Sequence, residues 1–190
     1  MRSCIFILLA TLGCQEKSRE AKALPPPDVK VVDATGAVVA ELRQIRPCRA
    51  LIGTQEMIVA GPPIQSTVGS VTWTGSDDVN GTTFLRGDER IARMFPLADA
   101  TSGAVFDMQG IAQVRIKVNG QVANVENRAG AVVRKLTLAG GTITSSDPAL
   151  TITGTDDLVL AGLLSAPELL PEIRSLAACT RVLVKKGGAS

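Results

Sequence analysis

The stretch VFDMQGIAQVRI, residues 105–116, places Asp, two variable residues and Gly between two arms of alternating apolar residues. The same unit recurs as VVDATGAVVAEL at 31–42 and as VENRAGAVVRKL at 125–136, where Asn replaces Asp. An Asp or Asn at the first turn position accepts a hydrogen bond from the backbone two residues on, and Gly three positions later adopts the left-handed conformation that closes a hairpin. The units therefore predict hairpin turns at Asp33–Gly36, Asp107–Gly110 and Asn127–Gly130.

The sequence around these units has the composition of an antiparallel β-protein. Residues 29–153 are rich in Val, Ile and Thr and are interrupted every eight to twelve residues by Gly, Asn or Asp, which is the spacing of consecutive hairpins. LRGDERIARMF at 85–95 and VNGQV at 118–122 predict two further turns. The second contains the Asn-Gly pair that favours two-residue type I′ loops. We therefore expect a mainly β fold whose antiparallel sheet is built from hairpins.

A different pattern begins at Thr155 and predicts one or two apolar C-terminal helices. Thr155 is placed to cap the first helix, and Asp156 and Asp157 lie where they meet the positive end of its dipole. The stretch that follows is apolar without interruption, and a helix that is apolar on all sides must be surrounded by protein.

A second helix is predicted where Ser165 and Glu168 form a capping box, with Pro167 tolerated in the first turn. Pro171 offers an alternative start several residues later. The predicted tail, Lys185–Ser190, should fray. The apolar face of this helix comprises Leu169, Ile173, Leu176, Ala177 and Val182.

Repeated hairpins followed by a strongly apolar C-terminal helix resemble the tubby-like and scramblase-related barrel over residues 29–184. The resemblance implies a closed antiparallel sheet that surrounds the helix. The lipid or phosphoinositide binding associated with the tubby-like family depends on basic residues for which this chain has no corresponding cluster, so no site is carried over. Without closure, the same elements would form a sandwich or roll with the helices packed on one face.

The N-terminus has the parts of a secretory signal: Arg2, a short apolar run and a small residue before a polar break. The run is shorter than the about 20 residues that a membrane span needs. Thr11-Leu12-Gly13-Cys14 resembles the lipobox of bacterial lipoproteins, which implies cleavage before Cys14 and a diacylglyceryl group on its sulfur. Thr11 and Leu12 depart from the usual Leu and Ala or Ser. The alternatives are a plain signal peptide cut nearby and an uncleaved leader.

The predicted domain order follows from this N-terminal signal. Residues 1–13 are the expected signal peptide, and 14–28 form a lipid-anchored flexible tether because QEKSREAKALPPPD is charged and then proline-rich. Residues 29–184 form a single β-rich domain, and 185–190 a tail. Gln15 after the cysteine resembles the Gram-negative signal for outer-membrane sorting. The expected location is the cell envelope, anchored to the outer membrane and facing the periplasm or the cell surface.

The chain has four cysteines. Cys4 leaves with the signal peptide and Cys14 is alkylated, so Cys48 and Cys179 remain as a pair in an oxidising compartment and predict a disulfide. The disulfide would close a loop of about 130 residues, which contributes about 4 to 5 kcal/mol to stability in the chain-entropy model. The alternatives are two buried free thiols or one reactive cysteine.

The sequence contains no pattern that assigns a catalytic residue. It has no histidine, no Ser-x-x-Lys and no Gly-x-Ser-x-Gly, which removes Cys–His and the common serine mechanisms. Asp156 and Asp157 are a carboxylate pair explained by the helix dipole. The acidic stretch at 74–83 lacks the ligand spacing of an EF-hand and is interpreted as a solvated turn. We assign the Arg-Gly-Asp at 86–88 to chance, and Trp73 to the core.

Composition limits the possible partners. The formal net charge is +2, and the chain has one Trp and no Tyr, so neither a basic footprint nor a stacking platform for nucleic acid is visible. No cofactor and no metal are predicted. The expected partners are the membrane, through the N-terminal lipid, and an envelope protein or a lipid.

We therefore expect a lipid-anchored envelope protein that binds or scaffolds and is not an enzyme. One alternative is a carrier of apolar ligands or lipids, which needs a partly empty barrel lumen. A filled barrel, occupied by the helix around 158–164, would favour protein interaction instead. A carboxylate-dependent hydrolase is the remaining alternative.

Overall fold

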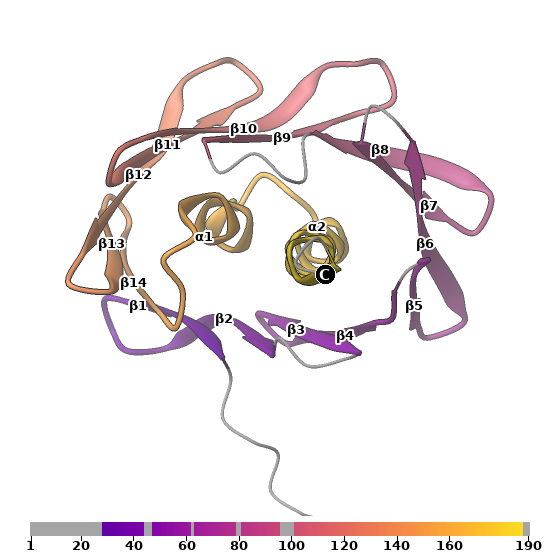
Figure 1. Ribbon diagram of the computed structural model, residues 1–190, viewed down its shortest axis with the longest axis horizontal. Coiled ribbons are helices and arrows are strands. Elements are labelled where there is room, and N and C mark those ends of the chain that lie inside the picture. Colours follow the sequence, from indigo (N-terminus) through magenta and orange to yellow (C-terminus); the bar gives the residue numbers. More distant parts are fainter. Residues whose placement is uncertain (1–27, 44–46, 62, 79–80, 96–100, 188–190) are drawn as a thin grey trace, which may run out of the picture.

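The computed structural model describes residues 28–43, 47–61, 63–78, 81–95 and 101–187. These residues form one antiparallel sheet of 14 strands followed by two helices. Figure 1 shows the sheet curled into an oval ring around both helices. The elements are β1 Val29–Asp33, β2 Val38–Arg43, β3 Cys48–Ile52, β4 Gln55–Val59, β5 Ile64–Val68, β6 Val71–Asp78, β7 Gly81–Arg86, β8 Glu89–Phe95, β9 Ser102–Phe106, β10 Ala112–Asn119, β11 Val122–Asn127, β12 Val132–Ala139, β13 Thr142–Ser146, β14 Ala149–Thr153, α1 Leu158–Ser165 and α2 Pro171–Gly187.

The sheet is a nearly closed barrel. Each strand pairs with its neighbours in sequence, except that β4 and β5 do not pair with each other, and β1 also pairs with β14, which joins the two ends of the strand series. The strand order ends at β4 and β5, which meet at a single bridge where Ala60 and Gln65 exchange two backbone hydrogen bonds of 2.7 and 3.0 Å. The predicted mainly β fold with C-terminal helices is confirmed, and the sheet takes the barrel form.

The three predicted Asp/Asn turns are confirmed. In the first, Asp33 Oδ1 accepts from the backbone N–H groups of Thr35 at 2.8 Å and Ala37 at 3.0 Å, and Gly36 has a φ of 83°. The Asp107 and Asn127 turns repeat this geometry. After each turn the pairing register shifts, which leaves one extra residue on the returning strand. Such bulges increase local twist, and in Figure 1 these hairpins project outside the ring.

The turn at VNGQV differs from the prediction. Asn119 pairs with Val122, so it is the last residue of β10, and the two loop residues are Gly120 and Gln121. Gly120 has a φ of 58°, whereas no described residue other than glycine has a positive φ. Positive φ at the first loop residue alone is the type II′ conformation, not the type I′ conformation that the Asn-Gly pair predicted.

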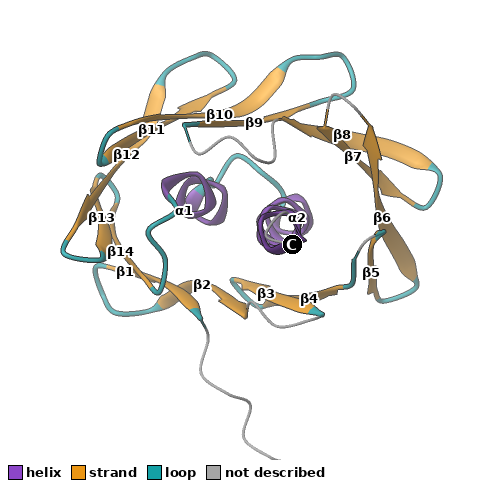
Figure 2. Ribbon diagram, in the orientation of Figure 1, coloured by secondary structure: helices purple, strands orange, loops and turns teal. Residues whose placement is uncertain are grey.

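Helix α1 lies inside the barrel, and all eight of its residues are buried. It packs against β10, β11 and β12. Two glycines permit the close approach: a Cβ on Gly162 would lie 2.8 Å from the Ile116 side chain, and a Cβ on Gly103 would lie 2.6 Å from Val159. The inference that an apolar helix must be enclosed is therefore confirmed, and Figure 2 shows both helices within the strands.

The predicted cap of α1 was wrong by two residues. The N-cap is Asp157, whose Oδ1 accepts from the N–H groups of Val159 and Leu160, both at 3.0 Å. Thr155 lies two residues before this cap, and its hydroxyl accepts from the backbone N–H of Asp157 at 3.0 Å. Thr155 thus positions the capping residue instead of capping the helix.

The predicted capping box of the second helix was also wrong. Ser165 is the last residue of α1, and its hydroxyl donates to the Gly162 carbonyl at 3.3 Å. Helix α2 begins at Pro171, which is the alternative start. The predicted apolar face of α2 is buried, as are the polar residues Arg174 and Arg181. The described part of α2 is therefore surrounded by protein.

Candidate functional site

The Cys48–Cys179 disulfide predicted from the sequence is present in the structure. It joins β3 to α2 across 131 positions of sequence, with the two Cα atoms 5.7 Å apart, and both residues are fully buried. The bond ties the helix in the barrel to the wall. Cys14 and the predicted leader and tether up to residue 27 lie outside the described residues.

The Asp156–Asp157 pair does not form a site with two free carboxylates. Asp157 Oδ2 accepts from Arg181 Nε at 2.8 Å, and Oδ1 accepts from Arg181 Nη2 at 2.9 Å, while Oδ1 also accepts from two helix amides. The Asp157 carboxylate is thus engaged on both oxygens at one end of the barrel. Asp156 lines a small depression of about 240 Å³ beside this ion pair.

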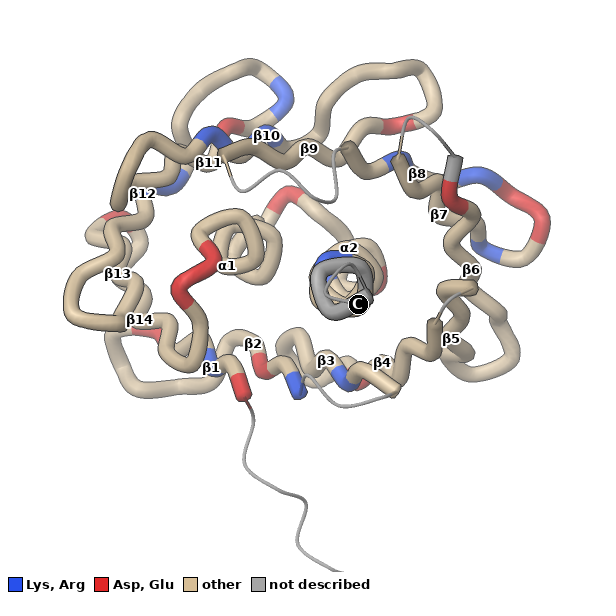
Figure 3. Tube along the Cα trace, viewed as in Figure 1, with Lys and Arg blue, Asp and Glu red and all other residues tan. Residues whose placement is uncertain are grey.

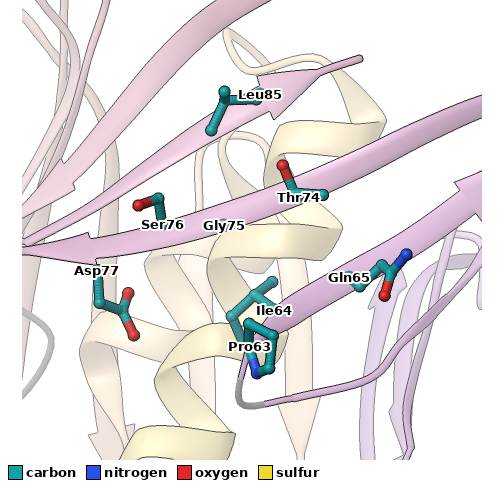
Figure 4. A pocket seen from close by; sticks show the side chains of 8 residues that line it. All are labelled: Pro63, Ile64, Gln65, Thr74, Gly75, Ser76, Asp77 and Leu85. Atoms are coloured by element: carbon teal, nitrogen blue, oxygen red, sulfur yellow. The ribbon is translucent and has the colours of Figure 1, made fainter. Parts of the chain in front are cut away.

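A larger depression of about 710 Å³ lies on the outer side of the barrel wall. Figure 4 shows its lining, which comes from the link before β5 and from β5, β6 and β7. On the inner face of the same wall, a Cβ on Gly75 would lie 2.8 Å from Ile64, so the strands there are packed closely. On the outer face the lining side chains are short or polar, apart from Leu85. The lining residues are Pro63, Ile64, Gln65, Thr74, Gly75, Ser76, Asp77 and Leu85.

A second depression, of about 210 Å³, continues this surface toward the β9–β10 turn. It shares Ser76 and Leu85 with the first, so the two form one outer groove across β5 to β8. Its further lining residues are Thr83, Arg90, Arg93 and Met108.

The end of the outer groove is cationic and is braced by aromatic side chains. The guanidinium carbon of Arg93 lies 4.8 Å from the ring centre of Phe95, within the range of a cation–π contact. Phe95 in turn meets Phe106 edge to face, with ring centres 5.4 Å apart. Among the described residues that line the groove, Asp77 is the one carboxylate, and it accepts from the Thr82 hydroxyl. The groove therefore offers hydroxyl, apolar and cationic contacts.

Other residues of interest in the sequence lie in the core, in a turn or in an ion pair. Trp73 is buried, as predicted. The Arg-Gly-Asp tripeptide forms the tight β7–β8 turn, in which Arg86 donates to Glu89 at 2.8 Å. Arg49 beside Cys48 lies 3.8 Å from Glu56. Asn80, in the acidic stretch at 74–83, lies outside the described residues. In the part of the chain that the structure describes, no three metal-ligating side chains gather, and neither helix combines the length and apolar character of a membrane span.

Comparison with known protein families, with curated proteins and with solved structures finds no match for this chain. The resemblances to bacterial lipoproteins and to the tubby-like barrel therefore remain predictions.

The sequence contained one signal of the outer groove that was not recognised. In SVTWTGSDD the residues that alternate with Trp73 are Thr72, Thr74 and Ser76, and an outer strand face made of small hydroxyl residues leaves room above the sheet. The cationic end could not be foreseen because Arg93 and Met108 belong to different hairpins.

Proposed function

We propose that this chain is a lipid-anchored envelope protein that acts as a non-enzymatic binding or scaffolding module. Cys14 carries the lipid, residues 15–28 form the tether, and the outer groove is the surface that binds an envelope partner.

The filled interior carries this proposal. All eight residues of α1 are buried inside the ring, and α2 beside it is bonded to the wall through Cys179. A carrier of apolar ligands needs an accessible lumen, and two enclosed helices occupy that space. Partner contacts on the outer wall are therefore favoured over ligand uptake into the barrel.

The outer groove suits an extended segment of a protein partner. Its main part is an open depression of about 710 Å³ on the barrel wall. Leu85 and Met108 supply apolar contacts, the Thr and Ser hydroxyls supply hydrogen bonds, and Arg90 and Arg93 favour an acidic group at one end. Figure 3 shows both charge signs interspersed around the wall, so this selectivity is local.

Site-specific photocrosslinking tests the groove. A photoreactive amino acid replaces Gln65 in the full chain, expressed in its native envelope, and the matched control replaces Lys135, which faces solvent on β12. We expect one discrete crosslinked partner at Gln65 and none at Lys135, and the crosslink should weaken with Arg93→Glu. Equal labelling at both positions, or none at Gln65, would contradict the proposal.

Intact mass measurement separately tests the predicted lipid anchor at Cys14 and the disulfide. The protein from membranes should begin at Cys14 with diacylglyceryl and acyl additions, and Cys48 and Cys179 should take up alkyl groups after reduction only. An unlipidated chain would remove the anchor. A lipid that co-purifies stoichiometrically would support the carrier alternative, and a measured activity lost on Asp157→Asn would support a hydrolase.

A further inference from the structure

Two arginines are buried inside the barrel near the connection between α1 and α2. Arg134 faces inward from β12 and is 6% exposed, and Arg174 on α2 is 8% exposed. Guanidinium groups are seldom buried to this extent without a charged or hydrogen-bonded partner. We call these two residues the buried arginine pair.

Packing brings the two side chains to the same region. Arg174 Nη2 donates to the Leu164 carbonyl, in the last turn of α1. Helix α1 packs against β12, the strand that carries Arg134. The two charges also affect each other: burial, and then the positive charge of Arg134, lower the pKa of Arg174 to about 10, against the opposing effect of Glu168. Arginine stays protonated at neutral pH in proteins, so both groups are cations.

The polar atoms of this cluster are incompletely paired. The Nε atoms of Arg134 and Arg174 and the Ser145 hydroxyl have no hydrogen-bond partner. Ser145 pairs with Leu136, two residues after Arg134 on the same inner face, so Arg134 and Ser145 are diagonal neighbours about 7–8 Å apart between β12 and β13. Glu168, on the exposed connection, acts on both arginines at longer range. Among the described residues, neither arginine has a carboxylate within 4.0 Å.

An anion bound between these side chains would supply acceptors for the donors that lack a partner. The two buried cations repel each other, and a buried charge without a partner is costly to the fold. Arginine presents several N–H donors in a planar fork that matches carboxylate and phosphate oxygens. We propose that the buried arginine pair and Ser145 form a binding site for a small oxyanion, a phosphate or a carboxylate. The Nε–H groups and the Ser145 hydroxyl donate to its oxygens.

Titration of the full-length chain with inorganic phosphate and, separately, with acetate tests the site. Binding is followed by calorimetry at constant ionic strength, with chloride as the replaced ion. Arg134→Met removes one cation while keeping an apolar stem. The matched control is Arg128→Met, because Arg128 is 59% exposed on the hairpin just before β12. We expect saturable binding by the wild type and by Arg128→Met, and binding at least tenfold weaker by Arg134→Met.

Ser145→Ala keeps both charges and provides a second variant if Arg134→Met fails to fold. It should weaken binding severalfold while leaving the unfolding midpoint in chloride nearly unchanged. Phosphate binding without acetate binding, or the reverse, identifies which oxyanion the site takes. Absence of saturable binding of either anion by the wild type would overturn the proposal, as would equal binding by Arg134→Met. These results are independent of the photocrosslinking of the outer groove.

Discussion

Removing the Asp157 carboxylate should destabilise the protein more than any exposed ion pair could. Asp157→Ala deletes the N-cap of α1, which is worth about 1 kcal/mol. It also leaves Arg181, which is 3% exposed in its side chain, buried without its 2.8 Å partner. Breaking a buried pair by removing one partner costs about 3–5 kcal/mol. The two effects together predict a loss of about 4–6 kcal/mol.

The assay is chemical unfolding at neutral pH of four proteins: wild type, Asp157→Ala, Arg181→Met and the double variant. Arg181→Met leaves the carboxylate with its two helix amides and should cost less, about 2 kcal/mol, the usual contribution of hydrogen bonds to a charged group. The double variant contains neither charge, so its loss should be smaller than the sum, with a coupling energy of about 2–3 kcal/mol.

A matched double-mutant cycle on an exposed ion pair gives the reference coupling energy. Lys117 Nζ lies 2.8 Å from Glu126 Oε1, but the Lys117 side chain is 63% exposed. Such pairs contribute about 0–1 kcal/mol, so the corresponding cycle should give little coupling. If the losses for Asp157→Ala and Arg181→Met simply add, or if Asp157→Ala costs less than about 1 kcal/mol, the ion pair does not hold α2 against the start of α1 and the reasoning fails.

Three further outcomes are expected. Replacing Cys48 and Cys179 by Ala together should lower the free energy of unfolding by up to about 5 kcal/mol in denaturant melts, because the closed loop is long; no change would contradict a formed disulfide. Gly162→Ala should cost about 1–3 kcal/mol by overpacking against Ile116, and Ile116→Val in the same chain should recover part of the loss. The Thr35 hydrogen bonds hold the pKa of Asp33 below its usual value. The ionised carboxylate therefore stabilises the fold at a pH above its unfolded pKa, and this stabilisation is lost as the pH falls through the folded pKa. Asp33→Asn should flatten the acid side of the stability profile, which is followed by urea midpoints between pH 2 and 7.

Much of the fold could be predicted because its signals are local. An Asp or Asn side chain that bonds to the backbone two residues on is visible in four letters of sequence, and the turns at Asp33, Asp107 and Asn127 formed as expected. The enclosed first helix was equally local, since a run of apolar residues on every side leaves no face for water. The loop at Asn119 was wrong because the strand continued one residue further than the Asn-Gly pair indicated.

Apart from the disulfide, features that depend on distant residues could not be predicted. Thr155, Asp156 and Asp157 are all reasonable caps by composition, and the choice of Asp157 is supported by a pairing with Arg181, 24 residues later. To predict the outer groove, one must know which strand faces point outward and that the hairpins meet across β5 to β8. The buried arginine pair is similar, because the sequence does not show that Arg134 on β12 and Arg174 on α2 lie in the same region of the barrel.

The position of the two helices limits how the barrel can function. To open a lumen, α1 and α2 would have to leave the ring, and two links oppose that movement. The Cys48–Cys179 bond is covalent, and the Asp157–Arg181 pair joins the start of α1 to α2 so that the helices hold each other. Both helices also carry buried leucines that would enter water, at a cost of about 1.5–3 kcal/mol for each large side chain. Release of the helices would therefore require reduction of the disulfide and loss of much of the core. This is the physical reason why we propose partner binding on the outer wall and not ligand uptake into the barrel.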